Sequence, residues 1–393
     1  MPRPSDLCPR PQPLPPLATQ PHAPPIYPAS VWACTSPQQA DDLLGGREAG
    51  YVYQRDGHPN ADLLSEKLRQ LHAADRGAIT ASGMGALAAA LLSRLEAGDH
   101  AVIGSRVYGK TLALFGGEAS RLAIETTAVD TCDLKAVEAA IRPTTRLLLA
   151  ETIANPLLEV ADVAALAEIA HRKNTALLID NTFASPILCR PLDLGADLVM
   201  ESLTKTLNGH SDVVLGFLGG REDVWKRVPG VISAWGLVSS PFDCWLAERG
   251  LATAHLRIER ACQNALAAAQ FLAGQQPRVA EVHYPGLPAH PQHTLAQRQF
   301  GGLFGTIVSF RLAGGRAAAD AFIDTAKQIP FCPSLGELST TLSHPETTSH
   351  RGLTPEQRRL LGISGGTIRL SVGTESLEFI RAALAQGLQG LER

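Results

Sequence analysis

Three things are scarce in this 393-residue sequence: lysine, closely spaced cysteines and long apolar runs. The seven cysteines are scattered and form no C-x-x-C, which argues against a disulfide framework or a zinc site and favours a reducing compartment. No apolar run reaches the roughly 18 residues that span a bilayer. The net charge of -3 gives no electrostatic reason to bind nucleic acid or an anionic membrane. We therefore expect a cytoplasmic protein with no metal site, no nucleic-acid partner and no membrane association.

The shortage of lysine directs attention to one loop. Only seven of the 35 basic residues are lysine, and one of them follows a short apolar run within Asp197–Asp212, DLVMESLTKTLNGHSD. There Ser202, Thr204 and Lys205 combine two hydroxyls with an amine, which can lose its proton where a guanidinium cannot. This loop can bind an anion through its hydroxyls and provide a reactive amine. A solvated surface lysine is the plainer interpretation of this stretch taken alone.

The order of apolar patterns predicts the architecture. From about residue 60 to 215, short apolar runs alternate with helical periods, which is typical of a mostly parallel sheet covered on both faces. We predict an α/β fold in three parts: an extended N-terminal arm (1–52), a large α/β domain (53–245) and a smaller C-terminal α+β domain (246–393). Prolines dominate the first 25 residues, which lack the apolar core of a signal peptide. The expected strands are Gly77–Ala81, His100–Gly104, Leu122–Val129, Arg146–Ala150, Ala176–Ile179, Leu198–Met200, Val279–His283, Thr306–Arg311 and Thr367–Val372, and one long helix is expected at Trp245–Gly274.

Polar residues follow four of these strands, where open α/β sheets bind ligands. They are Ser82-Gly83-Met84 at a helix start, Glu151 with Asn155, Asp180 with Thr182, and Ser202 with Thr204 and Lys205. Each group alone also fits an ordinary turn or helix cap. Together they provide a phosphate site, an amide, a carboxylate and an amine. Pyridoxal phosphate requires this set, because its aldehyde bonds a lysine, its ring nitrogen pairs with a carboxylate and its phosphate needs N–H and hydroxyl donors.

The chain resembles the Cys/Met-metabolism (trans-sulfuration) enzymes that use pyridoxal phosphate. That family includes cystathionine γ-synthase, cystathionine γ- and β-lyases, methionine γ-lyase and O-acylhomoserine sulfhydrylases. The resemblance implies pyridoxal 5'-phosphate as cofactor and the aspartate-aminotransferase-like fold type I. The matching motifs cover nearly the whole chain: Pro24–Tyr27, Tyr53–Gly57, Ser82–Met84, Tyr108-Gly109, Glu151 with Asn155-Pro156, Asp180–Phe183, Ser202–Lys205 with Asn208–His210, Ser334–Gly336 and Arg369–Glu375.

The resemblance also implies roles for individual residues. The catalytic residues are Lys205, which bonds the cofactor and moves protons, Asp180, which pairs with the ring nitrogen, and Tyr108, which stacks on the ring. Ser334 and Arg369, with Asn155, bind the substrate carboxylate. The implied assembly is a homotetramer of two active-site dimers. The further cofactor-binding residues are Gly83, Met84, Asn155, Thr182, Ser202 and Thr204, and Tyr53 and Arg55 reach the phosphate of the neighbouring subunit.

Most departures from the family pattern, such as Glu201 where a histidine is common, remove no catalytic group. Pro333 affects the expected chemistry, because enzymes acting on cystathionine often carry a glutamate there that meets the distal ammonium. Pro333 leaves room for homocysteine, methionine or an O-acylhomoserine. The expected reaction is γ-elimination from a sulfur amino acid of the cystathionine, homocysteine or methionine class, which yields a 2-oxo acid, ammonia and a thiol. The alternative is a γ-replacement synthase, either a cystathionine γ-synthase or an O-acylhomoserine sulfhydrylase.

A nucleotide hydrolase is the most distant alternative. Gly104–Thr111, GSRVYGKT, satisfies the phosphate-loop pattern G-x-x-x-x-G-K-[ST] and lies between a predicted strand and helix. In that interpretation Lys110 and Thr111 bind the nucleotide. It leaves Lys205 and Arg369 without a role.

Overall fold

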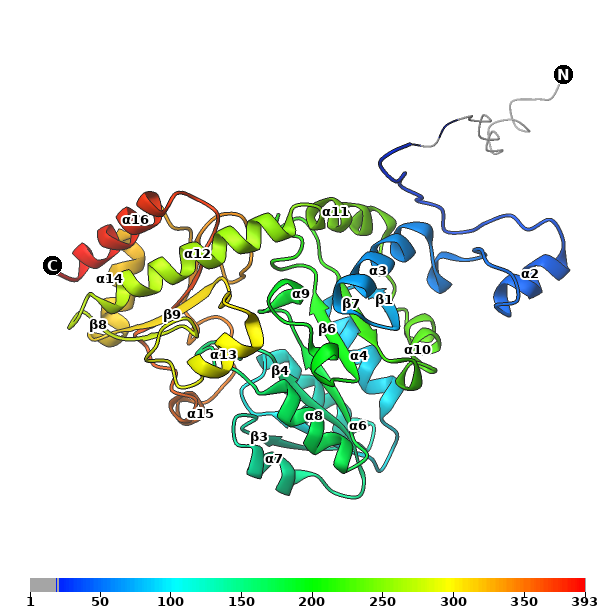
Figure 1. The fold of residues 1–393 in the computed structure, drawn as a ribbon, viewed down its shortest axis with the longest axis horizontal. Coiled ribbons are helices and arrows are strands. Elements are labelled where there is room, and N and C mark those ends of the chain that lie inside the picture. The colour runs from blue at the N-terminus through cyan, green and yellow to red at the C-terminus, as the bar shows by residue number, and fades with distance from the viewer. Residues whose placement is uncertain (1–18, 20, 393) are drawn as a thin grey trace.

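The structure is a computed structural model that describes residue 19 and residues 21–392. Two β-sheets lie side by side, and the long helix α12 (Ala254–Ala273) runs from one toward the other (Figure 1). The described part of the N-terminal arm, which includes α2 (Pro37–Leu44), extends away from the larger sheet. Most of the proline-rich stretch expected in that arm lies outside the described residues. No helix within residues 21–392 is long and apolar enough to cross a bilayer.

The larger sheet confirms the predicted mostly parallel α/β architecture. Its strand order is β1-β7-β6-β5-β4-β2-β3, and the pairs from β6 through β3 are all parallel. β7 pairs antiparallel with both β6 and β1. The strands are β1 (Arg76–Thr80), β2 (His100–Gly104), β3 (Glu125–Val129), β4 (Thr145–Glu151), β5 (Ala176–Asp180), β6 (Leu198–Ser202) and β7 (Gly216–Gly220).

Both faces of this sheet are covered by helices, which explains its continuously apolar strands. Along β4, Leu148 and Ala150 join one buried cluster, whereas Leu147 and Leu149 join another on the opposite face. α3 and α8 contribute to the first cluster, and α4 and α10 to the second. The helices of this part are α3 (Pro59–His72), α4 (Gly83–Arg94), α5 (Gly109–Ala113), α6 (Ala119–Arg121), α7 (Leu134–Ala140), α8 (Val163–Arg172), α9 (Ser185–Leu188), α10 (Val228–Ala234) and α11 (Pro241–Leu251).

The smaller sheet is antiparallel, in the order β10-β11-β9-β8, and has its own buried cluster. Its strands are β8 (Val279–His283), β9 (Ile307–Leu312), β10 (Thr341–Ser343) and β11 (Thr367–Ser371). Besides α12, its helices are α13 (His293–Phe300), α14 (Gly315–Thr325), α15 (Pro355–Leu360) and α16 (Leu377–Gln389). We retain the division near residue 245 as a proposal, supported by the buried cluster of the smaller sheet, which contains only residues after 264. Residues of α12, α13 and β9 also join the first cluster of the larger sheet, so the two parts share a packed boundary.

The predicted long helix Trp245–Gly274 was wrong, because the chain breaks between α11 and α12 at residues 252–253. Arg257, one turn into α12, points back and donates to the backbone oxygen of Gly250 at 2.8 Å. Arg257 thereby provides a hydrogen-bond donor for the Gly250 carbonyl, which in a continuous helix would accept from the backbone N–H four residues later. α11 packs on α3 beside the larger sheet, and α12 contacts β8 and β9 of the smaller one.

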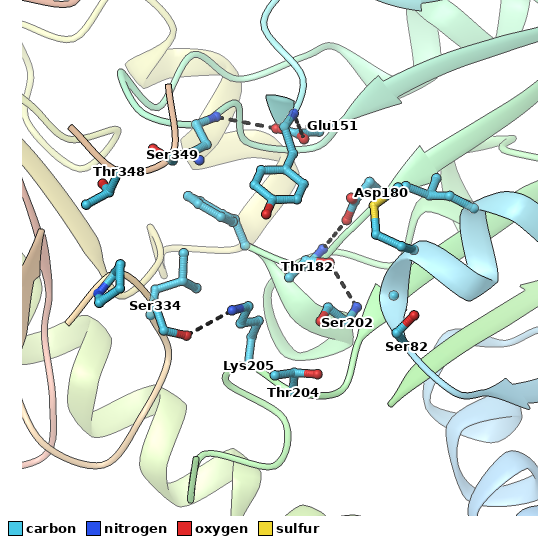
Figure 2. Close-up of a pocket in the computed structure, with 18 of the residues that line it drawn as sticks. Ser82, Glu151, Asp180, Thr182, Ser202, Thr204, Lys205, Ser334, Thr348 and Ser349 are labelled. Carbon is cyan, nitrogen blue, oxygen red and sulfur yellow. Dashed lines mark hydrogen bonds between the residues drawn. The ribbon is translucent and has the colours of Figure 1, made fainter. Parts of the chain in front are cut away.

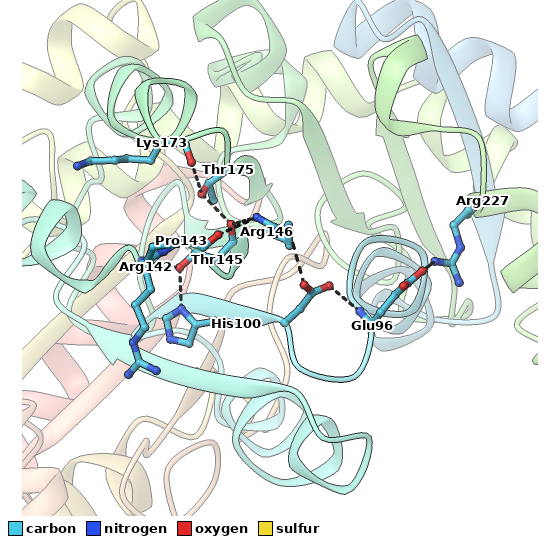
Figure 3. Close-up of polar contacts among 10 residues, drawn as sticks. Glu96, His100, Arg142, Pro143, Thr145, Arg146, Lys173, Thr175 and Arg227 are labelled. Atoms are coloured by element: carbon cyan, nitrogen blue, oxygen red, sulfur yellow. Dashed lines mark hydrogen bonds and ion pairs between the residues drawn. The ribbon is translucent and has the colours of Figure 1, made fainter.

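A polar network fixes the amino ends of the parallel strands (Figure 3). The Thr145 hydroxyl is bonded by His100 Nδ1 at 2.8 Å and by the backbone N–H of Arg142 at 2.7 Å. Thr175 donates from its hydroxyl to the Thr145 carbonyl at 3.2 Å. These bonds join β2, β4 and the approach to β5 at the edge remote from the strand ends that carry the predicted site.

Candidate active site

A cavity of about 550 Å³ lies at the carboxyl ends of β4, β5 and β6, within the usual size of a small-molecule site. Figure 2 shows side chains from both sheets converging on it. Of the predicted residues, only Tyr53 and Arg55 are absent from its lining. The predicted residues that line it are Gly83, Met84, Tyr108, Asn155, Asp180, Thr182, Ser202, Thr204, Lys205, Ser334 and Arg369.

Lys205 projects into this cavity from the turn that follows β6. Its Nζ donates to the hydroxyl of Ser334 at 2.9 Å (Figure 2). Burial, reinforced by the positive charge of Arg369, lowers the pKa of the Lys205 amine. A lysine that gives up its proton more readily than in water is a competent nucleophile toward an aldehyde.

Asp180, which is partly buried, and Glu151, which is buried, place two carboxyl groups at adjacent strand ends. They are paired in the register of β4 and β5. Burial raises the pKa of both, and the neighbouring Asp180 raises that of Glu151 further. Asp180 accepts a hydrogen bond from the Thr182 N–H at 3.0 Å, and within the described residues it forms no ion pair with a lysine, arginine or histidine. The protonated nitrogen of a bound pyridine ring would supply that missing positive charge.

A cradle for a phosphate forms where α4 begins beside the end of β6. Ser82 caps α4 by accepting from the Gly85 N–H at 3.0 Å. Gly83 and Met84 in the first turn line the cavity, where N–H groups of a helix start have no helical partners. A Cβ at Gly83 would lie 2.9 Å from the Cβ of Ser202, so only glycine permits this close approach. The Thr182 hydroxyl accepts from the Ser202 N–H at 3.0 Å and fixes that residue beside the helix start.

Arg369 of β11 forms the opposite, cationic part of the site. Its side chain is 3% exposed. It donates from Nη1 to the Asn155 side-chain oxygen at 2.9 Å and from Nη2 to the Ser334 carbonyl at 3.0 Å. Its Nε is buried without a partner among the described residues. Burial lowers the pKa of Arg369 to about 10, which leaves it charged at neutral pH. A carboxylate would satisfy both its charge and its unused donor.

The phosphate-loop interpretation of Gly104–Thr111 is not supported. The backbone N–H of Tyr108, within that segment, donates to the Glu151 carboxylate at 2.6 Å. A nucleotide phosphate there would face a carboxylate, and Lys110 does not line the cavity. Tyr108 itself does line the cavity and remains 40% exposed.

Sequence reasoning missed one wall of the cavity. It comes from the turn between β10 and β11, in the smaller sheet's part of the chain. Serines, threonines and an arginine in a turn carry no distinctive signal, because such residues are common on any surface loop. The missed lining residues of this turn are Thr347, Thr348, Ser349 and Arg351.

The sheet and the cavity define a class of protein. An amine of lowered pKa, a carboxylate without a cationic partner and a helix-start cradle at the carboxyl edge of a mostly parallel sheet fit pyridoxal phosphate. A separate arginine site adjoins them. These features describe a pyridoxal-phosphate enzyme of fold type I.

Comparison with known proteins makes the assignment more particular. The chain belongs to the family described as Cys/Met metabolism PLP-dependent enzyme, whose model matches residues 12–389. It is 41% identical over 372 residues to an L-methionine gamma-lyase of Porphyromonas gingivalis, covering 94% of this chain and 93% of that protein. It is 40% identical over 370 residues to an O-succinylhomoserine sulfhydrylase of Pseudomonas aeruginosa, covering 94% and 91%. The crystal structure of cystathionine gamma synthase from Xanthomonas oryzae in complex with cystathionine has a TM-score of 0.89 and 38% identity, covering 94% and 93%. The predicted family, fold class and cofactor are therefore confirmed.

Proposed function

We propose that this enzyme catalyses γ-elimination from a sulfur amino acid of the cystathionine, homocysteine or methionine class. The products are a 2-oxo acid, ammonia and a thiol. The observation that carries the proposal is the 2.9 Å contact between Lys205 Nζ and the Ser334 hydroxyl, because the Ser334 carbonyl in turn binds Arg369. The reactive amine thus lies beside the carboxylate site. The names of the γ-lyase and γ-synthase relatives support this class of reaction.

Several of the cavity residues have separate roles in this reaction. Arg369 holds the substrate's α-carboxylate, which fixes the adjacent Cα near Lys205. Lys205, whose burial favours the neutral amine, removes the Cα proton and returns it further along the substrate. Asp180 would hold the proton on the ring nitrogen of pyridoxal phosphate, which when bound would withdraw electrons from Cα. Tyr108 faces the cavity and donates a proton to the departing γ-substituent.

A γ-replacement reaction is the second candidate. Pro333 lines the cavity beside Ser334 and offers no carboxylate for the distal ammonium of cystathionine. This favours a substrate without that ammonium, such as an O-acylhomoserine, whose γ-substituent a thiol then replaces. The O-succinylhomoserine sulfhydrylase relative also supports it. The two reactions use the same residues up to departure of the γ-substituent.

The proposal includes an active site shared between two subunits. Tyr53 and Arg55 lie outside the cavity lining, and the Arg55 guanidinium sits 5.1 Å from the centre of the Tyr53 ring. Both belong to a segment at the base of the N-terminal arm. We propose that they reach the neighbour's phosphate in a homotetramer of two such dimers, in the cytoplasm. Mixing and reassembling inactive Arg55→Ala and Lys205→Ala subunits should restore activity, because hybrid dimers contain one intact site.

The deciding experiment is product analysis with the purified holoenzyme. L-cystathionine, L-homocysteine, L-methionine and O-acetyl-L-homoserine are supplied separately, with and without a thiol, and 2-oxobutanoate and ammonia are quantified. Release of both products in equal amounts without added thiol supports γ-elimination. Formation of a thioether amino acid when a thiol is added, with release of the acyl group as its acid and without 2-oxobutanoate or ammonia, supports γ-replacement. Turnover of none of these compounds, with cofactor bound, overturns the proposal.

A further inference from the structure

Arg351 is a second arginine of the active-site cavity, and the proposed reaction gives it no role. It lines the same cavity as Lys205 and Arg369. Among residues 21–392, its guanidinium has neither an ion pair nor a hydrogen bond. Two nearby arginines have carboxylate partners, Arg358 with Glu346 and Arg359 with Glu356. The cavity therefore contains a cation with free donors.

The turn that carries Arg351 is held against the cavity. His344 bonds the Gly365 carbonyl through Nε2 at 2.8 Å, and the His350 N–H donates to the Pro345 carbonyl at 2.9 Å. A Cβ at Gly109 would lie 3.3 Å from the Ser349 carbonyl, so this turn packs closely beside Tyr108. Contacts with Gly365 in the smaller sheet's part and Gly109 in the larger sheet's part thus fix the backbone of the turn that carries Arg351.

This wall faces the phosphate cradle across the cavity. Figure 2 shows Thr348 and Ser349 on the side opposite Ser82 and Ser202. The cofactor's phosphate would occupy the cradle side, which leaves this wall for the γ-substituent of a substrate whose Cα lies at Lys205.

The charged residues that line the cavity favour an anionic group beside Arg351. Arg369 is taken by the α-carboxylate, so Arg351 is the cation left for a second group. The cavity's two carboxyl groups, Glu151 and Asp180, lie at the strand ends, and Glu151 already accepts from the Tyr108 N–H. The remaining residues of this wall are uncharged: Pro333, Ser334, Leu335, Thr347, Thr348 and Ser349.

We propose that Arg351 binds a carboxylate on the γ-substituent of the substrate. Among the O-acylhomoserines of the γ-replacement candidate, an ester with an anionic acyl group is then preferred over one with a neutral acyl group. An arginine fork suits a carboxylate geometrically and electrostatically. A zwitterionic γ-substituent fits less well, because no carboxylate on this wall meets an ammonium. This inference rests on the proposed function for the direction of the γ-substituent.

The test compares two esters that differ in this one charge, O-succinyl-L-homoserine and O-acetyl-L-homoserine. The holoenzyme and its Arg351→Gln, Arg351→Lys and Arg359→Gln variants are assayed for kcat/KM with each ester. The wild type should prefer the succinyl ester, and Arg351→Gln should lower the succinyl-to-acetyl ratio of kcat/KM by about 10- to 100-fold, as expected for loss of a charge-assisted contact. Arg351→Lys should retain part of the preference. Arg359→Gln, an exposed arginine outside the cavity, is the matched control.

Inhibition by the free acids provides a readout independent of ester turnover. With a reactive sulfur amino acid as substrate, succinate should inhibit the wild type more strongly than acetate, and Arg351→Gln should remove most of that difference. An unchanged ester ratio in Arg351→Gln, with wild-type turnover intact, overturns the role of Arg351 but leaves the proposed function standing. A wild type that turns over neither ester nor any sulfur amino acid overturns the proposed function, and this inference with it.

Discussion

Replacing Arg369 by alanine should disable substrate binding without releasing the cofactor. In the structure the guanidinium is almost fully buried and uses two of its nitrogens on Asn155 and Ser334, with Nε unsatisfied. A substrate carboxylate on this group forms charge-assisted hydrogen bonds worth about 1.5–3 kcal/mol each. Partial rehydration of the emptied site offsets some of the loss. We expect kcat/KM to fall by about 100- to 1,000-fold, which corresponds to about 3–4 kcal/mol.

The assay separates binding from chemistry. The carboxylate contact is the same in the bound substrate and in the transition state, so the change should appear mainly in KM. Arg369→Lys should be intermediate, because an ammonium is a point charge rather than a fork. Arg311→Ala, which removes a half-exposed arginine from the neighbouring strand β9, is the control. An Arg369→Ala enzyme with intact cofactor absorbance and kcat/KM within about threefold of wild type would refute this location of the carboxylate site.

Three further predictions concern Glu201, Asp180 and Arg257. Burial raises the pKa of Glu201, so the native state keeps a proton that the unfolded chain loses, and wild-type stability falls as pH rises above the ordinary carboxyl pKa. The stabilising effect of Glu201→Gln on the cofactor-free protein, measured by urea unfolding, should therefore grow from about pH 5 to pH 8; an effect independent of pH would contradict this. Asp180→Asn should lower kcat by at least about 100-fold and alter the visible absorption of the bound cofactor, because the ring nitrogen loses its counter-ion; a kcat near wild type would argue against the pairing. Arg257→Ala should lower the free energy of unfolding by about 2–4 kcal/mol, because the carbonyls of Thr206 and Leu207, in the loop after Lys205, lose their hydrogen bonds to the guanidinium. A loss below about 1 kcal/mol would show that these bonds are dispensable.

The sequence was most informative where one physical rule determines position. Strands buried on both faces are continuously apolar, so β4, β5 and β6 could be located. Parallel strands share a carboxyl edge, so the polar residues after them had to meet. That rule brings Asp180 and Lys205 into one cavity although they lie in different loops.

The missed features depend on contacts that no local pattern records. β7 is rich in glycine and resembles a turn, yet a Cβ at Gly216 would lie 2.2 Å from the Ser82 carbonyl, so glycine is required beside the cradle. The break before α12 depends on Arg257 reaching the Gly250 carbonyl. Arg351 lines the cavity because the turn between β10 and β11 packs beside Gly109, next to Tyr108. Each of these features depends on a tertiary contact between segments that are separated in the sequence.

The central claim is that Lys205 carries the cofactor, and chemical reduction tests it most directly. Borohydride treatment of the holoenzyme fixes a lysine-bound pyridoxal phosphate covalently, and peptide mass mapping then locates the pyridoxyl group. The account predicts that the modified peptide contains Lys205 and that Lys205→Ala yields none. Modification at another lysine, such as Lys110, or no modified peptide from a cofactor-saturated protein, would contradict it.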